Sequence, residues 1–242
     1  MKTFQNPIIP GFYPDPSIVR VNEDYYLVNS SFEYFPAIPI WHSKDLVHWK
    51  QIGHAIDREE QGLDLSRVNA SGGVQAATIR YHQGMFYISS TRVNPEWPGS
   101  NYHFIVTAKD PKGPWSPCHF IDDAPGIDSA LFFDGDTAYM LANQHKDVYD
   151  QGSETNIWIQ EIDLNNMTLK GDRHVLWDGT GGVFAEGPRL YKKDDVYYLL
   201  IAEGGTLHHH ATTVASSKHL FGPYKSSRRN PLLTHRHLNR TY

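Results

Sequence analysis

Four copies of one pattern constrain the fold of this chain more than any other feature. Each copy consists of a short apolar strand, a polar turn and an aromatic-rich strand, which is typical of a β-hairpin. The copies lie at residues 15–28, 76–89, 128–141 and 186–200. Their starts are about 50–60 residues apart, and this period, with several short strands in each unit, indicates the blades of a β-propeller.

Three further segments share a second pattern, in which a small residue and a lysine lead into a turn that ends on an aromatic side chain. They lie at residues 43–49, 108–115 and 217–224, and we expect them in the outer strands of the same blades. Residues 157–164 alternate as a half-buried strand does, and no segment has the periodicity of an amphipathic helix. The sequence therefore predicts a single all-β domain over residues 1–242.

The starts of the four copies carry an unusual set of side chains, namely Asp15, Ala76, Asp128 and Glu186. In a propeller the first strand of each blade lines the central channel, so these positions converge at one end of the axis. Three carboxylates brought together from distant positions are costly as mere structure, because like charges repel and lose solvation. Such a cluster is typical of a catalytic site.

The first of these carboxylates lies between two prolines, Pro14 and Pro16. Each proline fixes its own φ and biases the residue before it toward extended geometry, so we expect Asp15 on a stiff, extended backbone. Taken alone, this segment is also a common turn. The repeat is what favours a functional interpretation.

Composition argues against several kinds of partner. The formal net charge is −5 and no basic cluster occurs, so a nucleic-acid partner is not expected. No signal-peptide core or bilayer-spanning stretch is found in the sequence, which predicts a cytoplasmic protein without a membrane partner. The single cysteine, Cys118, excludes an intramolecular disulfide and is expected to pack in the interior.

Aromatic residues crowd together after the first hairpin, at Phe32, Tyr34, Phe35 and Trp41. Aromatic faces near carboxylates suit sugar rings, whose C–H faces are apolar while their edges carry hydroxyls. Ordinary packing between blades explains the same cluster equally well. Both interpretations stay open at this point.

Three consecutive histidines, His208, His209 and His210, suggest a metal site. Consecutive strand residues point to alternate faces, so at most two of them could meet one ion. A loop with one functional histidine is favoured over a structural zinc site.

Five motifs, which occur in the right order along the whole chain, resemble glycoside hydrolase family 43 and in particular its β-xylosidase/α-L-arabinofuranosidase branch. They lie at residues 6–17, 71–73, 126–129, 185–188 and 203–206. The resemblance implies a five-bladed β-propeller and an O-glycosyl hydrolase that acts by single displacement with inversion. Its substrate would be a xylo-oligosaccharide or an arabinose-substituted oligosaccharide, from which a terminal xylose or arabinose is released.

The resemblance also implies roles for the three carboxylates. Asp15 resembles the general base that activates water, and Glu186 resembles the general acid that protonates the departing oxygen. Asp128 resembles the third carboxylate, which orients the acid and raises its pKa. General chemistry agrees, because an inverting glycosidase needs two carboxyl groups roughly 6.5–9.5 Å apart, one of them protonated near neutral pH.

Phe32 and His208 are expected in the sugar pocket because they lie beside the matched motifs. Gln75 departs from the pattern of the family, in which a tryptophan often walls the sugar site close to the Gly-Gly pair. We expect Gln75 to hydrogen-bond a sugar hydroxyl instead of stacking on the ring.

The chain is also short for the family. By the repeat spacing, a fifth blade would begin near residue 243, roughly where the sequence stops. We therefore expect an incomplete propeller domain of about four blades, without the fifth blade and without the C-terminal β-sandwich of this branch.

Several alternatives stay open. The chain could be an inactive remnant or a sugar-binding protein, or an α-L-arabinofuranosidase rather than a β-xylosidase. A retaining glycosidase that acts on fructosyl sugars would need carboxyl groups about 5–5.5 Å apart, and a protein-interaction propeller would not need the acidic triplet. The resemblance allows a central calcium ion, although no complete ligand set is visible, and acid–base hydrolysis needs no organic cofactor. Oligomeric state is also open, a homo-oligomer included.

Overall fold

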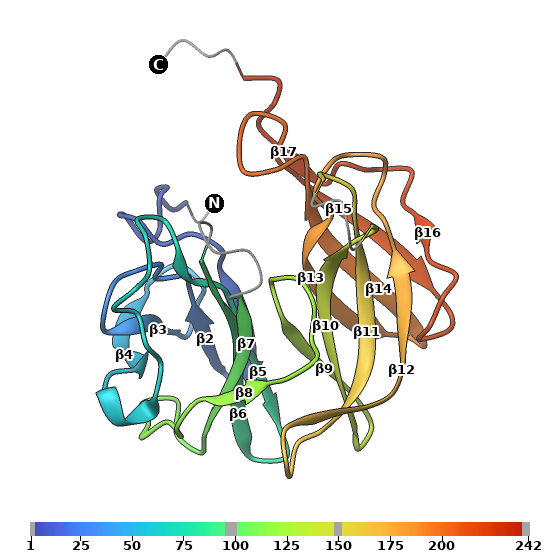
Figure 1. Ribbon diagram of the computed structural model, residues 1–242. Coiled ribbons are helices and arrows are strands. Elements are labelled where there is room, and N and C mark those ends of the chain that lie inside the picture. The colour runs from blue at the N-terminus through green and yellow to red at the C-terminus, as the bar shows by residue number, and fades with distance from the viewer. Residues whose placement is uncertain (1–2, 95–100, 148–151, 239–242) are drawn as a thin grey trace. The chain divides into compact units, whose positions relative to one another are not determined.

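The computed structural model describes residues 3–94, 101–147 and 152–238. The chain divides into two compact units, Met1–Asp122 and Asp123–Tyr242, and each is described here by itself. Within the described residues, the only helical element is a 3-10 turn, η1 (Glu59–Gln61), so the fold is all-β (Figure 1). None of the described residues forms a helix long and apolar enough to cross a membrane.

The first unit contains two antiparallel sheets of four strands, each a simple meander in chain order. The first sheet consists of β1 (Ser17–Val21), β2 (Asp24–Val28), β3 (Ala37–Ser43) and β4 (Lys50–Ile56). The second consists of β5 (Gly73–His82), β6 (Met85–Val93), β7 (Tyr102–Ala108) and β8 (His119–Ile121).

The second unit repeats this arrangement. Its first sheet consists of β9 (Ala130–Asp134), β10 (Thr137–His145), β11 (Thr155–Asp163) and β12 (Thr168–Trp177). Its second sheet consists of β13 (Glu186–Lys193), β14 (Val196–Glu203), β15 (Ala211–Ser217) and β16 (Lys225–Ser226), and β17 (Leu233–Thr234) also pairs with β15. The outer edge of this sheet is thus made of two short strands.

Four-stranded meanders of this kind are the blades of a β-propeller, so the prediction of about four blades is confirmed. All four predicted hairpins are present as β1–β2, β5–β6, β9–β10 and β13–β14. The segments at 43–49, 108–115 and 217–224 are wrong as outer strands. They are the turns that join the third strand of a blade to its fourth, and two of them end on a buried aromatic anchor, Trp115 or Tyr224.

Each unit has its own core of apolar side chains from the facing sides of its two sheets. In the first unit, Ile40 of β3 and Phe104 of β7 belong to one cluster, with Cys118 packed against it. Burial raises the pKa of the Cys118 thiol to about 12, which agrees with the predicted packing role. In the second unit, Ile159 of β11 and Leu199 of β14 belong to the corresponding cluster. Each such side chain contributes about 1.5–3 kcal/mol when buried, so both blades of a unit are held by one shared core.

Candidate active site

In each of the four blades, a residue just before the first strand or within its first four positions has the left-handed conformation. These residues are Asp15 (φ 54°), Ala76 (φ 49°), Asp128 (φ 65°) and Gly187 (φ 58°). Each lies the same number of residues before the turn of its hairpin. The predicted equivalence of the repeat starts is therefore correct for three blades and off by one in the fourth. There Gly187 occupies the shared position and Glu186 precedes it.

The same observation corrects the backbone prediction for the first carboxylate. Asp15 has a φ of 54° and is not extended, although a following proline disfavours helical geometry. The left-handed residue recurs in all four blades, so the requirement of the fold at this position overrides the local preference set by the prolines. Its side chain is exposed.

Asp15 is tied to both blades of the first unit by one buried serine. The hydroxyl of Ser30, which is 2 % exposed, donates a hydrogen bond to Asp15 Oδ2. The Ser30 hydroxyl oxygen in turn accepts a hydrogen bond of 2.7 Å from the backbone N–H of Ala76. Ser30 therefore fixes the Asp15 carboxylate relative to β5 of the neighbouring blade.

Phe32 and Gln75 lie at the same end of these two blades as Asp15. Phe32 exchanges two backbone hydrogen bonds of 2.9 Å with Val74, and its ring packs on that of Phe12 at 5.4 Å. The side chain of Gln75 donates to the carbonyl of Ser71 at 2.9 Å. The structure thus brings Asp15, Phe32 and Gln75 to one end of the first unit.

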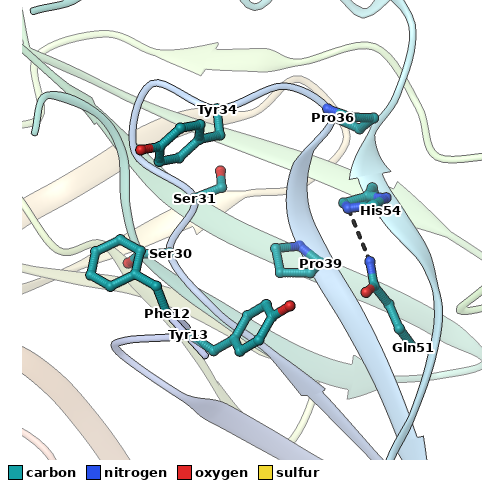
Figure 2. Close-up of a pocket in the computed structure, with 9 residues that line it drawn as sticks. All are labelled: Phe12, Tyr13, Ser30, Ser31, Tyr34, Pro36, Pro39, Gln51 and His54. Atoms are coloured by element: carbon teal, nitrogen blue, oxygen red, sulfur yellow. Dashed lines mark hydrogen bonds between the residues drawn. The ribbon is translucent and has the colours of Figure 1, made fainter. Parts of the chain in front are cut away.

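A cavity of about 380 Å³ opens beside this end of the first blade (Figure 2). Two of the aromatic side chains that line it, Phe12 and Tyr34, are 66 % and 62 % exposed. A Gln51–His54 hydrogen bond of 3.0 Å supplies a polar wall, and burial lowers the pKa of His54 below its ordinary value. Ser30 also lines the cavity, which places it next to the Asp15 carboxylate.

The aromatic cluster noted in the sequence is divided between packing and exposure. Trp41 is only 9 % exposed and contacts the ring of Tyr13 edge-on at 4.8 Å, so it belongs to the interior. Tyr34 and Phe35 are exposed at 62 % and 50 %. The packing interpretation is correct for Trp41, and the exposed pair stays available to a ligand.

In the second unit, Asp128 makes the contact between blades that Ser30 makes in the first. Its side chain is 7 % exposed, and Oδ2 accepts a hydrogen bond of 2.9 Å from the backbone N–H of Gly187. Gly187 is the positional equivalent of Ala76. The Ser30–Ala76 and Asp128–Gly187 hydrogen bonds therefore join neighbouring blades through equivalent backbone N–H groups. Asp128 therefore holds the peptide that links Glu186 to Gly187.

Glu186 is half-buried and begins β13 opposite Ala202 of β14. A bulge between Glu186 and Arg189 accommodates the left-handed Gly187. A bulge of this kind re-aims the adjacent side chains and is common beside active sites. Glu186 matches Gln75 in blade position, because each directly precedes the left-handed residue of its blade.

His208 lies in the turn between β14 and β15, at the same end of the blade as Glu186. The predicted loop is therefore confirmed, and the argument from alternating strand faces does not apply, because the chain reverses there. No group of three or more His, Cys, Asp or Glu side chains suited to a metal ion occurs among the described residues.

Sequence reasoning missed two residues that hold the site. Ser30 lies two residues after Val28, the buried end of β2, and a buried polar residue at such a position is a signal that could have been read. Gly187 also left a signal, because a glycine tolerates a positive φ without strain. Its place directly after Glu186 could have revealed the one-residue offset.

Comparisons with known proteins agree with this architecture. The model of the family described as "Glycosyl hydrolases family 43" matches residues 4–242. A xylosidase/arabinosidase of Butyrivibrio fibrisolvens is 49 % identical over 98 % of this chain and 46 % of its own length. A non-reducing end α-L-arabinofuranosidase of Bacteroides ovatus is 44 % identical over 96 % of this chain and 42 % of its own length.

Solved structures give the same result. The crystal structure of a xylan β-1,4-xylosidase from Bacillus halodurans matches with a TM-score of 0.89 and 40 % identity. The match covers 96 % of this chain and 45 % of that one. The chain thus spans less than half the length of the relatives it matches.

Proposed function

Because this chain belongs to glycosyl hydrolase family 43, we propose that it hydrolyses terminal xylose or arabinose from xylo-oligosaccharides or arabinose-substituted oligosaccharides, with inversion. Two of the relatives it matches are named as a xylosidase/arabinosidase and an arabinofuranosidase. The observation that carries the proposal is the hydrogen bond from Gly187 N–H to Asp128, because it anchors the residue next to Glu186 with a buried carboxylate.

In the proposed reaction, Asp15 is the general base. Its exposed carboxylate takes a proton from a water molecule, whose oxygen then forms a bond to the anomeric carbon. Ser30 restricts the rotation of this carboxylate, so the base keeps one orientation. A fixed reacting group removes part of the entropic barrier of the step.

Glu186 is the proposed general acid. As the bond between the anomeric carbon and the glycosidic oxygen breaks, Glu186 donates its proton to that oxygen, and the leaving sugar departs as an alcohol. Asp128 is proposed to orient Glu186, since it holds the adjacent peptide through Gly187 N–H at 2.9 Å.

The cavity beside Asp15 supports a sugar as the ligand. Exposed rings of Phe12 and Tyr34 offer apolar faces, and the Gln51–His54 pair offers hydrogen-bonding groups. A pocket with apolar walls and few polar groups is typical of small-ligand sites. Phe32 and Gln75, at the same end of the first unit, are proposed to contact the substrate, and His208 is also proposed as a substrate-binding residue.

Substitution of Glu186 tests the proposal. Glu186→Gln should slow the hydrolysis of xylobiose by about 10²–10⁴-fold, while an aryl glycoside with an activated leaving group should lose much less. A matched control is Asp195→Asn, which alters a carboxylate in the β13–β14 hairpin at the opposite end of the same strand. An equal loss on both substrates would rule out Glu186 as the acid.

A further inference from the structure

One buried carboxylate in the second unit has no part in the proposed reaction. Glu203 ends β14 and is 2 % exposed. It accepts hydrogen bonds from both the backbone N–H of Thr180, at 2.8 Å, and the hydroxyl of Thr180. A carboxylate is costly to bury, so this interaction calls for an explanation beyond packing.

Two glycines, Gly179 and Gly182, lie so close to this carboxylate that a side chain at either position would press against it. A Cβ atom at Gly179 would lie 2.4 Å from Glu203 Oε2, and one at Gly182 would lie 3.2 Å from the carboxyl carbon. Gly179 also has a φ of +85°, which side chains rarely tolerate. The chain therefore packs directly against the Glu203 carboxylate at Gly179, Thr180 and Gly182.

The segment 179–182 is followed closely in the chain by Glu186. The carbonyl of Val183 accepts a hydrogen bond of 2.7 Å from Gly204 N–H, and the carbonyl of Ala185 accepts one of 2.9 Å from the hydroxyl of Thr155. Glu186 itself pairs with Ala202, the residue before Glu203. The strand end that carries Glu203 thus contacts the segment both at its start and where it reaches Glu186.

We propose that Glu203 is a positioning residue for the general acid. Its carboxylate fixes residues 179–182, and this segment with its following contacts sets the direction in which Glu186 leaves the backbone. Asp128 holds the peptide after Glu186, and Glu203 holds the segment before it. The inference rests on the proposed role of Glu186.

Two substitutions at Glu203 and one control test the inference in the full chain. Glu203→Ala removes the acceptor, whereas Glu203→Gln keeps an acceptor of nearly the same shape for Thr180 N–H. Asp134→Ala is the control, because Asp134 also accepts two hydrogen bonds, at 2.8 Å from Lys192 and 2.5 Å from Tyr197. Asp134 is the last residue of β9, at the opposite end of this strand from Asp128.

The kinetic readout is kcat on xylobiose compared with kcat on an activated aryl xyloside. Glu203→Ala should lower the ratio of the two about 10-fold, since a small displacement of a catalytic group is expensive, and Glu203→Gln should restore most of it. Asp134→Ala should leave the ratio unchanged. A ratio that stays constant in Glu203→Ala would overturn the inference.

A second readout does not depend on turnover. Hydrogen exchange of the amides in residues 179–186 should accelerate at least about 10-fold in Glu203→Ala and little in Glu203→Gln or Asp134→Ala. Unchanged exchange in Glu203→Ala would overturn the inference even if the chain hydrolyses neither substrate. Absence of turnover in the unaltered chain would instead count against the proposed function.

Discussion

Ser30 offers the sharpest test of how the first unit holds its carboxylate. Ser30→Ala removes one hydroxyl that donates to Asp15 Oδ2 and accepts from Ala76 N–H at 2.7 Å. Ala76 is 7 % exposed, so its N–H group loses its acceptor in a place that water reaches poorly. The substitution therefore acts on both the stability of the unit and the orientation of the Asp15 carboxylate.

The magnitude follows from these two bonds. A buried donor left without an acceptor costs about 1–3 kcal/mol, and loss of a hydrogen bond to a charged group costs about 1.5–3 kcal/mol. Asp15 is exposed, so water replaces much of the second contribution. We expect Ser30→Ala to lower the free energy of unfolding by about 2–3 kcal/mol.

Urea denaturation followed by tryptophan fluorescence measures this loss. Ser31→Ala is the matched control for stability, because Ser31 also accepts a buried backbone N–H, that of Ile38 at 3.2 Å, and no hydrogen bond to Asp15 is found for it in the described part of the chain. We expect about 1–2 kcal/mol for the control. A Ser30→Ala protein that is as stable as the unaltered chain would refute the reasoning.

Two further predictions test other contacts. Hydrogen bonds from Lys192 and Tyr197 hold the pKa of Asp134 below its ordinary value; this stabilisation is complete above the unfolded value of about 3.9 and is lost as the pH falls through the folded value. The urea concentration at the midpoint of unfolding should therefore decrease as the pH is lowered below about 4. The decrease should be less steep in Asp134→Asn, and equal pH dependence in the two proteins would contradict the prediction. Gly73→Ala places a Cβ atom 2.2 Å from a backbone carbonyl oxygen and should cost more than about 3 kcal/mol. Gly84→Ala has a φ of +81° but no neighbour within 4 Å and should cost only about 1–2 kcal/mol; similar losses at both glycines would show that the contact is not as tight as described.

The blade pattern was predictable because the strands of a hairpin have a recognisable pattern in the local sequence. Alternating apolar and aromatic residues around a polar turn predict hairpins at β1–β2 and β13–β14 without any distant information. The outer strands were less predictable. The segment at 108–115 has a strong turn signal with an aromatic anchor, but β8 is short, at His119–Ile121, and has little pattern of its own.

Motifs in the sequence nominated the residues of the candidate site, but they did not predict the backbone conformation there. Asp15, Asp128 and Glu186 were visible as motifs, and the structure brings Asp128 next to the peptide of Glu186. The left-handed φ of Asp15 was not visible, because a position shared by all four blades overrides local proline preferences. Glu203 was part of a motif, but its interaction with Thr180 depends on a tertiary contact that spacing does not reveal.

The most direct test of the account is the anomeric configuration of the first sugar released from p-nitrophenyl β-D-xyloside. Proton NMR follows this product before mutarotation, and p-nitrophenyl α-L-arabinofuranoside serves as the parallel substrate that identifies the preferred sugar. The account predicts α-xylose as the first product, with no turnover in Asp15→Ala. Release of β-xylose first, or undiminished turnover in Asp15→Ala, would contradict inversion with Asp15 as the base.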